Sequence, residues 1–276
     1  MRLLMGAAAV AGAAYLLLAA ALFLFQEQLI YFPEIGRDDA GTPARHGLAY
    51  DDVSIATADG ETLHAWYVAA PDARGTALFF HGNAGSIAQR IDWLPAFRHL
   101  RLNTLLVEYR GYGRSSGMPS EQGMYRDAAA AFAHLTGARG AAAQDVVVFG
   151  ESLGGAVAVW LAEKSRPGAL VVMSAFTSVP DLAAELYPFL PARRLARFDY
   201  DALGRIRRVT CPVLVAHSPQ DEIVPYAHGR RLFEAAPEPK QFLDLGGGHN
   251  DGFIFTRREW VDQLGAFLDR HWRAAP

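Results

Sequence analysis

Residues 146–160 read VVVFGESLGGAVAVW. The first four residues are bulky and apolar, which is typical of a strand that is buried on both faces. The Ala- and Val-rich stretch after Leu153 predicts a helix. Between them, Gly150-Glu151-Ser152-Leu153-Gly154 matches G-x-S-x-G, a pattern in which a serine occupies a sharp strand-to-helix turn with its hydroxyl group exposed. This context predicts that Ser152 is a catalytic nucleophile; the alternative is an ordinary strand-helix turn.

A second match to the same pattern, Gly113-Arg114-Ser115-Ser116-Gly117, lies in a different context. It follows Gly111-Tyr112 rather than an apolar strand, and it runs into Pro119 rather than a helix. We therefore reject Ser115 as the nucleophile.

Short apolar runs alternate with helical patterns along most of the chain. Continuous apolar strands of this kind predict an α/β fold, with a mostly parallel central sheet and helices on both faces. Ahead of them, Asp59-Gly60 separates two alternating segments and predicts an antiparallel hairpin. The runs are 77–80, 104–107, 146–149, 170–172, 213–215 and 241–244, and the expected helices are 87–100, 122–135, 153–163, 228–235 and 253–272.

The alternation of apolar strands and helices is interrupted between residues 177 and 208. Three prolines and a basic cluster fill this interval, which we interpret as a small cap above the strand ends. Its apolar residues are candidates either for the lining of an acyl pocket or for the core of the cap: Leu186, Tyr187, Phe189 and Leu190.

A serine hydroxyl group needs a base to take its proton, and after this type of turn the acid and the histidine follow in that order. Four histidines follow Ser152, and only His249 lies in a glycine-rich loop just past the last strand. Such loops at strand carboxyl ends bind ligands. His217 ends a strand, while His228 and His271 fall on predicted helices. His249 is the predicted base.

Asp221 is the predicted acid, because it lies in the loop one strand before His249, and the adjacent Glu222 is the fallback. The oxyanion hole requires two N–H donors. We assign them to the backbone of Leu153 and of Asn83, the latter in the loop after strand 77–80. His81 in the same loop is interpreted as a structural turn residue.

Residues 3–25 carry no charged side chain, a run of 23. As a helix this run is about 34 Å long, enough to cross a hydrocarbon core of about 30 Å. We predict an uncleaved transmembrane anchor at 3–25, a linker or packing arm at 26–49 and the main domain at 50–276. A buried core helix is the alternative. The positive charge ahead of the run favours an inside amino terminus and an exported body.

The composition narrows the class of protein. The 276 residues are 51% hydrophobic and 20% charged, with a formal net charge of -3, so the chain is globular and nucleic acid is not an expected partner. The single cysteine, Cys211, excludes an intramolecular disulfide and is interpreted as a core residue. The histidines form no metal-binding pattern and no dinucleotide or phosphate-loop motif occurs, so neither a metal nor a cofactor is expected.

Four motifs occur along the chain in order: HGNAG at 81–85, EYRGYGRS at 108–115, GESLGG at 150–155 and GGHND at 247–251. The segment after the apolar run reads FQEQLIYFP at 25–33. Together they resemble the membrane-anchored alpha/beta hydrolases of the bud-emergence type, to which the protein depalmitoylases of animals are related. The resemblance covers nearly the whole chain, anchor included.

This resemblance implies the alpha/beta-hydrolase fold, a triad of Ser152, Asp221 and His249, and hydrolysis of esters or thioesters. One departure is Ser218-Pro219, where relatives usually have a glycine. The expected protein is a serine hydrolase of acyl esters or thioesters, held to membrane lipid by its anchor in a bacterial inner membrane, with a periplasmic body. A serine peptidase of the same fold and a non-catalytic membrane scaffold are the alternatives.

Overall fold

The computed structural model describes residues 1–35, 41–251 and 257–272. Its centre is an eight-stranded sheet with the order β1-β2-β4-β3-β5-β6-β7-β8. The β1–β2 pair is antiparallel and the pairs from β4 to β8 are parallel, as the sequence predicts; the β2–β4 pair, for which the sequence analysis made no prediction, is also antiparallel. The strands are β1 (Asp51–Ala56), β2 (Thr62–Val68), β3 (Gly75–Phe80), β4 (Leu102–Val107), β5 (Val146–Glu151), β6 (Ala169–Met173), β7 (Val213–His217) and β8 (Lys240–Asp244).

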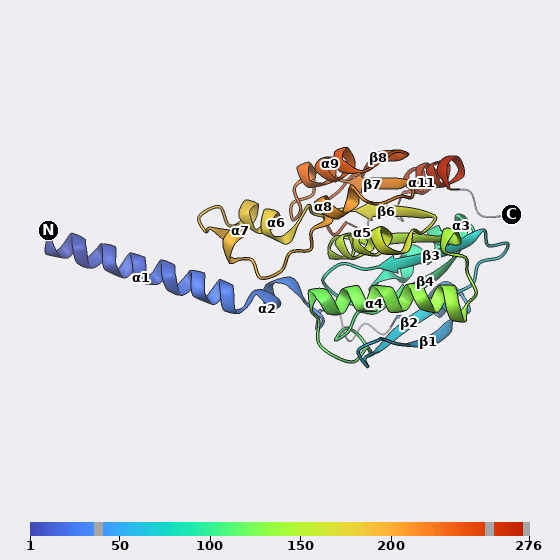
Figure 1. The fold of residues 1–276 in the computed structure, drawn as a ribbon, viewed down its shortest axis with the longest axis horizontal. Coiled ribbons are helices and arrows are strands. Elements are labelled where there is room, and N and C mark those ends of the chain that lie inside the picture. Colours follow the sequence, from blue (N-terminus) through green and yellow to red (C-terminus); the bar gives the residue numbers. More distant parts are fainter. Residues whose placement is uncertain (36–40, 252–256, 273–276) are drawn as a thin grey trace.

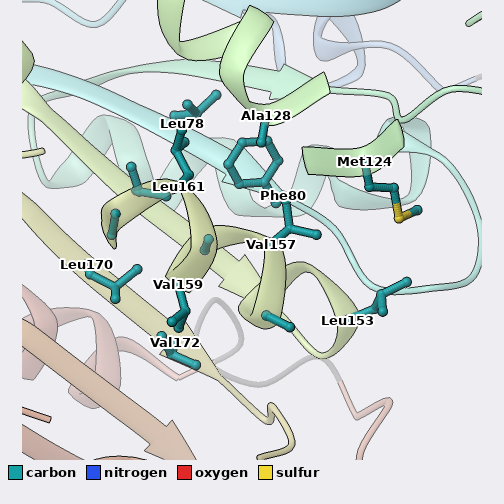
Figure 2. Close-up of a cluster of buried hydrophobic side chains, with 14 of the residues drawn as sticks. Leu78, Phe80, Met124, Ala128, Leu153, Val157, Val159, Leu161, Leu170 and Val172 are labelled. Atoms are coloured by element: carbon teal, nitrogen blue, oxygen red, sulfur yellow. The ribbon is translucent and has the colours of Figure 1, made fainter. Parts of the chain in front are cut away.

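Helices cover both faces of this sheet (Figure 1). One face carries α4 (Glu121–Ala133), α5 (Leu153–Ser165), α8 (Ala202–Ile206) and α9 (Tyr226–Ala235), and the other carries α3 (Leu94–His99) and α11 (Arg258–His271). Alternate residues of the buried strands point to opposite faces. In β5, for example, Val146 and Val148 belong to the α5 side of the core, shown in Figure 2, whereas Val147 and Phe149 belong to the other side.

The expected elements are largely confirmed, with two differences. The predicted helix 87–100 is a 3-10 helix, η2 (Ile87–Trp93), followed by the short α3. Pro95 in the first turn of α3 has no N–H to donate to the carbonyl group of Ile91, and this missing hydrogen bond weakens a continuous α-helix at the junction between η2 and α3. The last helix begins at Arg258, and residues 253–256 of the predicted range lie outside the described residues.

The interval predicted as a cap contains two different parts. The first is the α6–α7 segment, residues 178–197, which includes α6 (Val179–Leu186) and α7 (Ala192–Leu195). The second is α8, whose Ala202 and Ile206 are fully buried and which packs against α5. The part that stands apart from the sheet layers therefore ends before α8.

The apolar run at the amino terminus forms α1 (Arg2–Leu24), which extends away from the body (Figure 1). None of its residues is buried, so the alternative of a core helix is wrong. The short α2 (Gln26–Ile30) follows, and Phe32 then forms an isolated parallel bridge with Ala84. The first part of the predicted arm therefore packs directly on the loop after β3.

The EYRGYGRS motif builds a buried ion-pair network beside the sheet. The Arg110 side chain donates to both oxygens of Asp59 and to Asp127, and the Arg110 backbone N–H also donates to Asp127. Asp127 is fully buried, and burial raises its pKa while Arg110 lowers it. Removing the arginine would leave a buried carboxylate without its counter-charge.

We expect Arg110→Ala to lower the free energy of unfolding by about 3 kcal/mol, because the loss of one partner of a buried pair is costly. Arg126→Ala is the matched control, since Arg126 also pairs with Asp59 but has a side chain that is 54% exposed. Its expected cost is below about 1 kcal/mol. Urea denaturation of both variants measures the difference, and equal costs would contradict the network's role.

Candidate active site

Ser152 lies at the junction between β5 and α5, in the turn that the sequence predicts. Its backbone has φ 53° and ψ -117°, an unfavourable conformation that non-glycine residues adopt mostly at functional sites. The two flanking glycines make this turn possible. A Cβ on Gly150 would lie 2.2 Å from the carbonyl oxygen of Gly154, and a Cβ on Gly154 would lie 2.2 Å from that of Phe80.

We expect Gly154→Ala to destabilise the protein by about 3 kcal/mol and to lower kcat about a hundredfold, because the added methyl group must push the turn away from β3. Gly137→Ala is the matched control: a Cβ at Gly137 meets nothing within 4 Å, so that variant should keep wild-type stability and activity. Thermal unfolding and ester hydrolysis measure both effects. A fully active Gly154→Ala variant would show that the close approach is not needed.

The three residues that the sequence singles out for catalysis lie in hydrogen-bond contact. Ser152 Oγ is 3.1 Å from Nε2 of His249, and His249 Nδ1 is 2.8 Å from Oδ2 of Asp221. They come from three different loops at the carboxyl ends of β5, β7 and β8, which meet at one edge of the sheet. All three are nearly buried, with Ser152 8% and His249 6% exposed.

Backbone N–H groups as well as His249 form hydrogen bonds with the Asp221 carboxylate. Its Oδ1 accepts hydrogen bonds from the backbone N–H groups of Ile223 and Val224, at 3.0 and 2.8 Å. Burial raises the pKa of Asp221, but hydrogen bonds from His217 and His249 outweigh this and hold the pKa well below its ordinary value. Asp221 is therefore a carboxylate at neutral pH, oriented toward the imidazole.

His217 is a contact of Asp221 that the sequence analysis did not assign. Its Nε2 lies 2.8 Å from the carbonyl oxygen of Val224, so this nitrogen donates, and it is also 3.3 Å from Asp221 Oδ2. The side chain is fully buried at the end of β7. The only available signal was its position four residues before Asp221. Beside it, Ser218 donates to the carbonyl oxygen of Gly247 and thereby joins the Asp221 loop to the His249 loop.

The fallback acid Glu222 and the residues that the sequence analysis did not favour make structural contacts. Glu222 Oε2 accepts from the backbone N–H of His249 and so holds the loop. The Ser115 hydroxyl group accepts from the backbone N–H of His64 and donates to the carbonyl oxygen of Glu108. His228 Nδ1 accepts from the backbone N–H of Thr177. Burial raises the pKa of the Cys211 thiol to about 12, which suits a core residue.

Asn83, a predicted oxyanion-hole residue, is fixed by the end of α2, the segment after it and Tyr112. Its carbonyl oxygen accepts from the Phe32 N–H at 2.9 Å and from the Tyr112 hydroxyl group at 2.8 Å. Its side-chain amide donates to the carbonyl oxygen of Ile30 at 3.0 Å. The sequence analysis did not foresee these contacts, which join residues far apart in the chain. His81 in the same loop is buried against Tyr109 and Tyr112.

A cavity of about 450 Å³ opens beside Ser152, within the range of about 300–1,000 Å³ usual for ligand sites. Asn83, Leu153 and His249 line it at the catalytic end. None of the described residues that line it is Asp, Glu, Lys or Arg. Of the predicted pocket residues, Leu186, Tyr187 and Leu190 line it and Phe189 does not. The opposite wall comes from α1 and α2: Ala19, Leu22, Phe23, Gln26, Leu29 and Ile30.

The order of the strands and the turn at Ser152 define an alpha/beta hydrolase. The fold resembles the solved esterase Pf2001 of Pyrococcus furiosus, with a TM-score of 0.72 and 18% identity, covering 88% of this chain and 99% of the other. Residues 71–198 match the family described as "Serine aminopeptidase, S33".

Two curated relatives define the family more narrowly. Protein bem46 of Schizosaccharomyces pombe is 33% identical over 74% of this chain and 72% of its own length. The human alpha/beta hydrolase domain-containing protein 17B is 31% identical over 78% and 73%. The chain belongs to the alpha/beta-hydrolase family of bem46 and protein 17B.

Proposed function

We propose that the chain is a membrane-anchored serine hydrolase that cleaves carboxylic ester or thioester bonds of acyl substrates. The observation that carries this proposal is the hydrogen-bonded series Ser152, His249 and Asp221 at the end of an apolar cavity. Family membership and the fold it shares with an esterase support hydrolysis in general. The substrate class rests on the character of the cavity.

In this proposal His249 Nε2 takes the proton of Ser152 Oγ as the oxygen attacks the acyl carbonyl carbon. Asp221 keeps the proton of His249 on Nδ1 and stabilises the imidazolium. The backbone N–H groups of Leu153 and Asn83 receive the oxyanion, and the amino-terminal end of α5 favours negative charge there. The imidazolium then protonates the leaving alcohol or thiol, and water hydrolyses the acyl-enzyme by the same route.

A serine peptidase is the second candidate, because the matching family is described as an aminopeptidase. Such an enzyme must bind the ammonium group of a peptide amino terminus, which calls for a carboxylate near the serine. Neither Asp nor Glu is among the described residues lining the cavity, and apolar side chains predominate. The lining therefore favours an acyl chain over a peptide amino terminus.

The proposal places α1 across a membrane. Apart from Arg2 its residues carry no charge, and the helix of 23 residues is long enough to span a membrane and has no buried residue. The positive charge of Arg2, ahead of the charge-free run 3–25, and Glu27 after it favour an exported body. The Ala- and Arg-rich composition suggests a bacterial inner membrane with the catalytic domain in the periplasm.

The test is labelling of the membrane-embedded protein with a fluorophosphonate probe, followed by mass spectrometry of the modified peptide. The expected label lies on Ser152, and competition by p-nitrophenyl esters and acyl thioesters then identifies the preferred bond. No labelling of a folded protein would instead support the non-catalytic scaffold. Protection by peptides but not by acyl compounds would support the peptidase.

A further inference from the structure

The α6–α7 segment lies alongside the carboxyl-terminal half of α1 (Figure 1). The hydroxyl group of Tyr15 donates to the carbonyl oxygen of Phe189 at 3.1 Å. At the base of the helix, the side chain of Gln26 donates to Leu195 O at 2.7 Å and accepts from Arg197 N at 2.8 Å. Hydrogen bonds at two levels therefore fix the segment against the anchor.

These contacts set the depth of the segment relative to a membrane. Tyr15 precedes Leu24 by nine residues, or about 14 Å of helix. If α1 crosses a hydrocarbon core of about 30 Å, Tyr15 lies well inside it. Even when its side chain runs toward Leu24, the hydroxyl group stays on the hydrocarbon side of the helix end. Phe189, which accepts its hydrogen bond, must lie there as well.

The tip of the segment, residues 186–190, has the chemistry that this depth requires. Leu186 is 46% and Phe189 56% exposed, so this short tip presents two large apolar side chains close together in the chain. The hydrogen bond from Tyr15 satisfies a backbone carbonyl group that would be costly to leave unpaired in hydrocarbon.

Basic side chains follow the tip at the level where headgroups would lie. The guanidinium group of Arg197 is 5.9 Å from the ring centre of Phe23, near the end of α1, and 3.9 Å from Glu27 in the first turn of α2. Arg193 and Arg194 are exposed on α7, which follows the tip in the chain, and Arg193 also forms an ion pair with Asp181 at 3.0 Å. An apolar tip flanked by long basic side chains, which can extend toward phosphate groups, is typical of a segment that lies in a membrane interface.

The catalytic cavity runs between these two elements. Leu22 and Phe23 of α1 form one wall, Leu186 and Leu190 of the tip form another, and Ser152 lies at the inner end. We infer that the tip, residues 186–190, inserts into the lipid leaflet beside α1, so that the cavity opens to hydrocarbon and takes its acyl chain directly from the leaflet. This inference rests on the proposed function, because it requires α1 to cross the membrane and the cavity to hold an acyl group.

The test measures the surroundings of the tip in the full chain, reconstituted in phosphatidylcholine vesicles. An environment-sensitive nitrobenzoxadiazole label is attached to Phe189→Cys, to Leu17→Cys in α1, and to Met118→Cys, which is 83% exposed on the body. The native Cys211 is buried, and the unsubstituted chain serves as the blank. Lipids carrying a nitroxide on the acyl chain then quench any label that reaches hydrocarbon.

The expected result is a blue-shifted emission and strong quenching at positions 17 and 189, with neither at 118. Quenching at 17 but not at 189 would overturn the inference and leave the anchor intact. No quenching at either position would refute the membrane span in the proposed function, and the inference with it. None of these readings depends on catalysis, which the serine label tests separately.

A second measurement tests whether the tip is needed for substrate to enter the cavity from the lipid leaflet. Phe189→Asp places a charge where hydrocarbon is expected, and Met118→Asp is the matched control. The ratio of hydrolysis of a long-chain ester embedded in vesicles to that of a soluble short-chain ester should fall about tenfold or more in Phe189→Asp alone. An unchanged ratio would refute entry of substrate from the leaflet.

Discussion

Replacing Ser152 by Ala is expected to lower kcat for ester hydrolysis by about a million-fold while the protein stays folded. Removing the nucleophile of a serine triad leaves only the rate enhancement of substrate binding and the oxyanion donors. The alanine side chain fits the same turn, because only an oxygen atom is lost at a position that is 8% exposed. The measurement is turnover of a short-chain p-nitrophenyl ester, with circular dichroism to confirm the fold.

The matched control is Ser115→Ala, at the other serine that satisfies the same pattern. Ser115 Oγ accepts from the backbone N–H of His64 and donates to the carbonyl oxygen of Glu108, so its loss should cost stability of about 1 kcal/mol and little activity. Near wild-type turnover by Ser152→Ala, or a comparable loss in Ser115→Ala, would refute the assignment of the nucleophile.

The features that sequence reasoning found are those that local residues determine. The apolar run of β5 followed by Gly150 and Gly154 defines a strand, a turn and a helix within a few residues, so the turn could be predicted without knowing its surroundings. The hairpin around Asp59-Gly60 is likewise local, and its register pairs Ile55 with Leu63. The predicted alpha/beta-hydrolase fold is confirmed on this basis.

The features that it missed depend on contacts between distant residues. No local pattern indicates that the amide of Asn83 donates to Ile30, 53 residues earlier, or that α1 contributes a wall of the cavity. His217 is ambiguous for the same reason, because a histidine at the end of an apolar strand gives no sign of the carboxylate beside it. Pro95 was visible in the sequence, and its effect on the predicted helix 87–100 could have been anticipated.

A second large loss of activity is expected for Asp221→Asn. The hydrogen bonds around Asp221 determine which way the amide group of the asparagine would be oriented. Two backbone N–H groups, of Ile223 and Val224, donate to Oδ1, so the amide oxygen must keep that position. The NH2 group then takes the place of Oδ2 and faces His249 Nδ1 as a donor. His249 must accept on Nδ1 and carry its proton on Nε2, where it can no longer accept the proton of Ser152.

We therefore expect kcat to fall about ten-thousandfold in Asp221→Asn, the size of effect that the wrong histidine tautomer produces in a serine triad. Glu222→Gln is the matched control, since its oxygen can still accept from the His249 backbone N–H, and its turnover should stay within a few-fold of wild type. The reverse pattern, with activity lost in Glu222→Gln and kept in Asp221→Asn, would assign the acid to Glu222.

The stability of the same variant supplies an independent measurement. Because the pKa of Asp221 is lowered in the folded protein, its carboxylate contributes stability above the ordinary aspartate pKa of about 4, and this contribution is lost as the pH falls toward the lowered value. Asparagine cannot supply it at any pH, and its NH2 group also faces the donating Nε2 of His217. The gap in urea midpoint between wild type and Asp221→Asn should therefore be largest near neutral pH and narrow below pH of about 4. A gap that is constant with pH would show that the negative charge of Asp221 does not contribute to the stability of the folded protein.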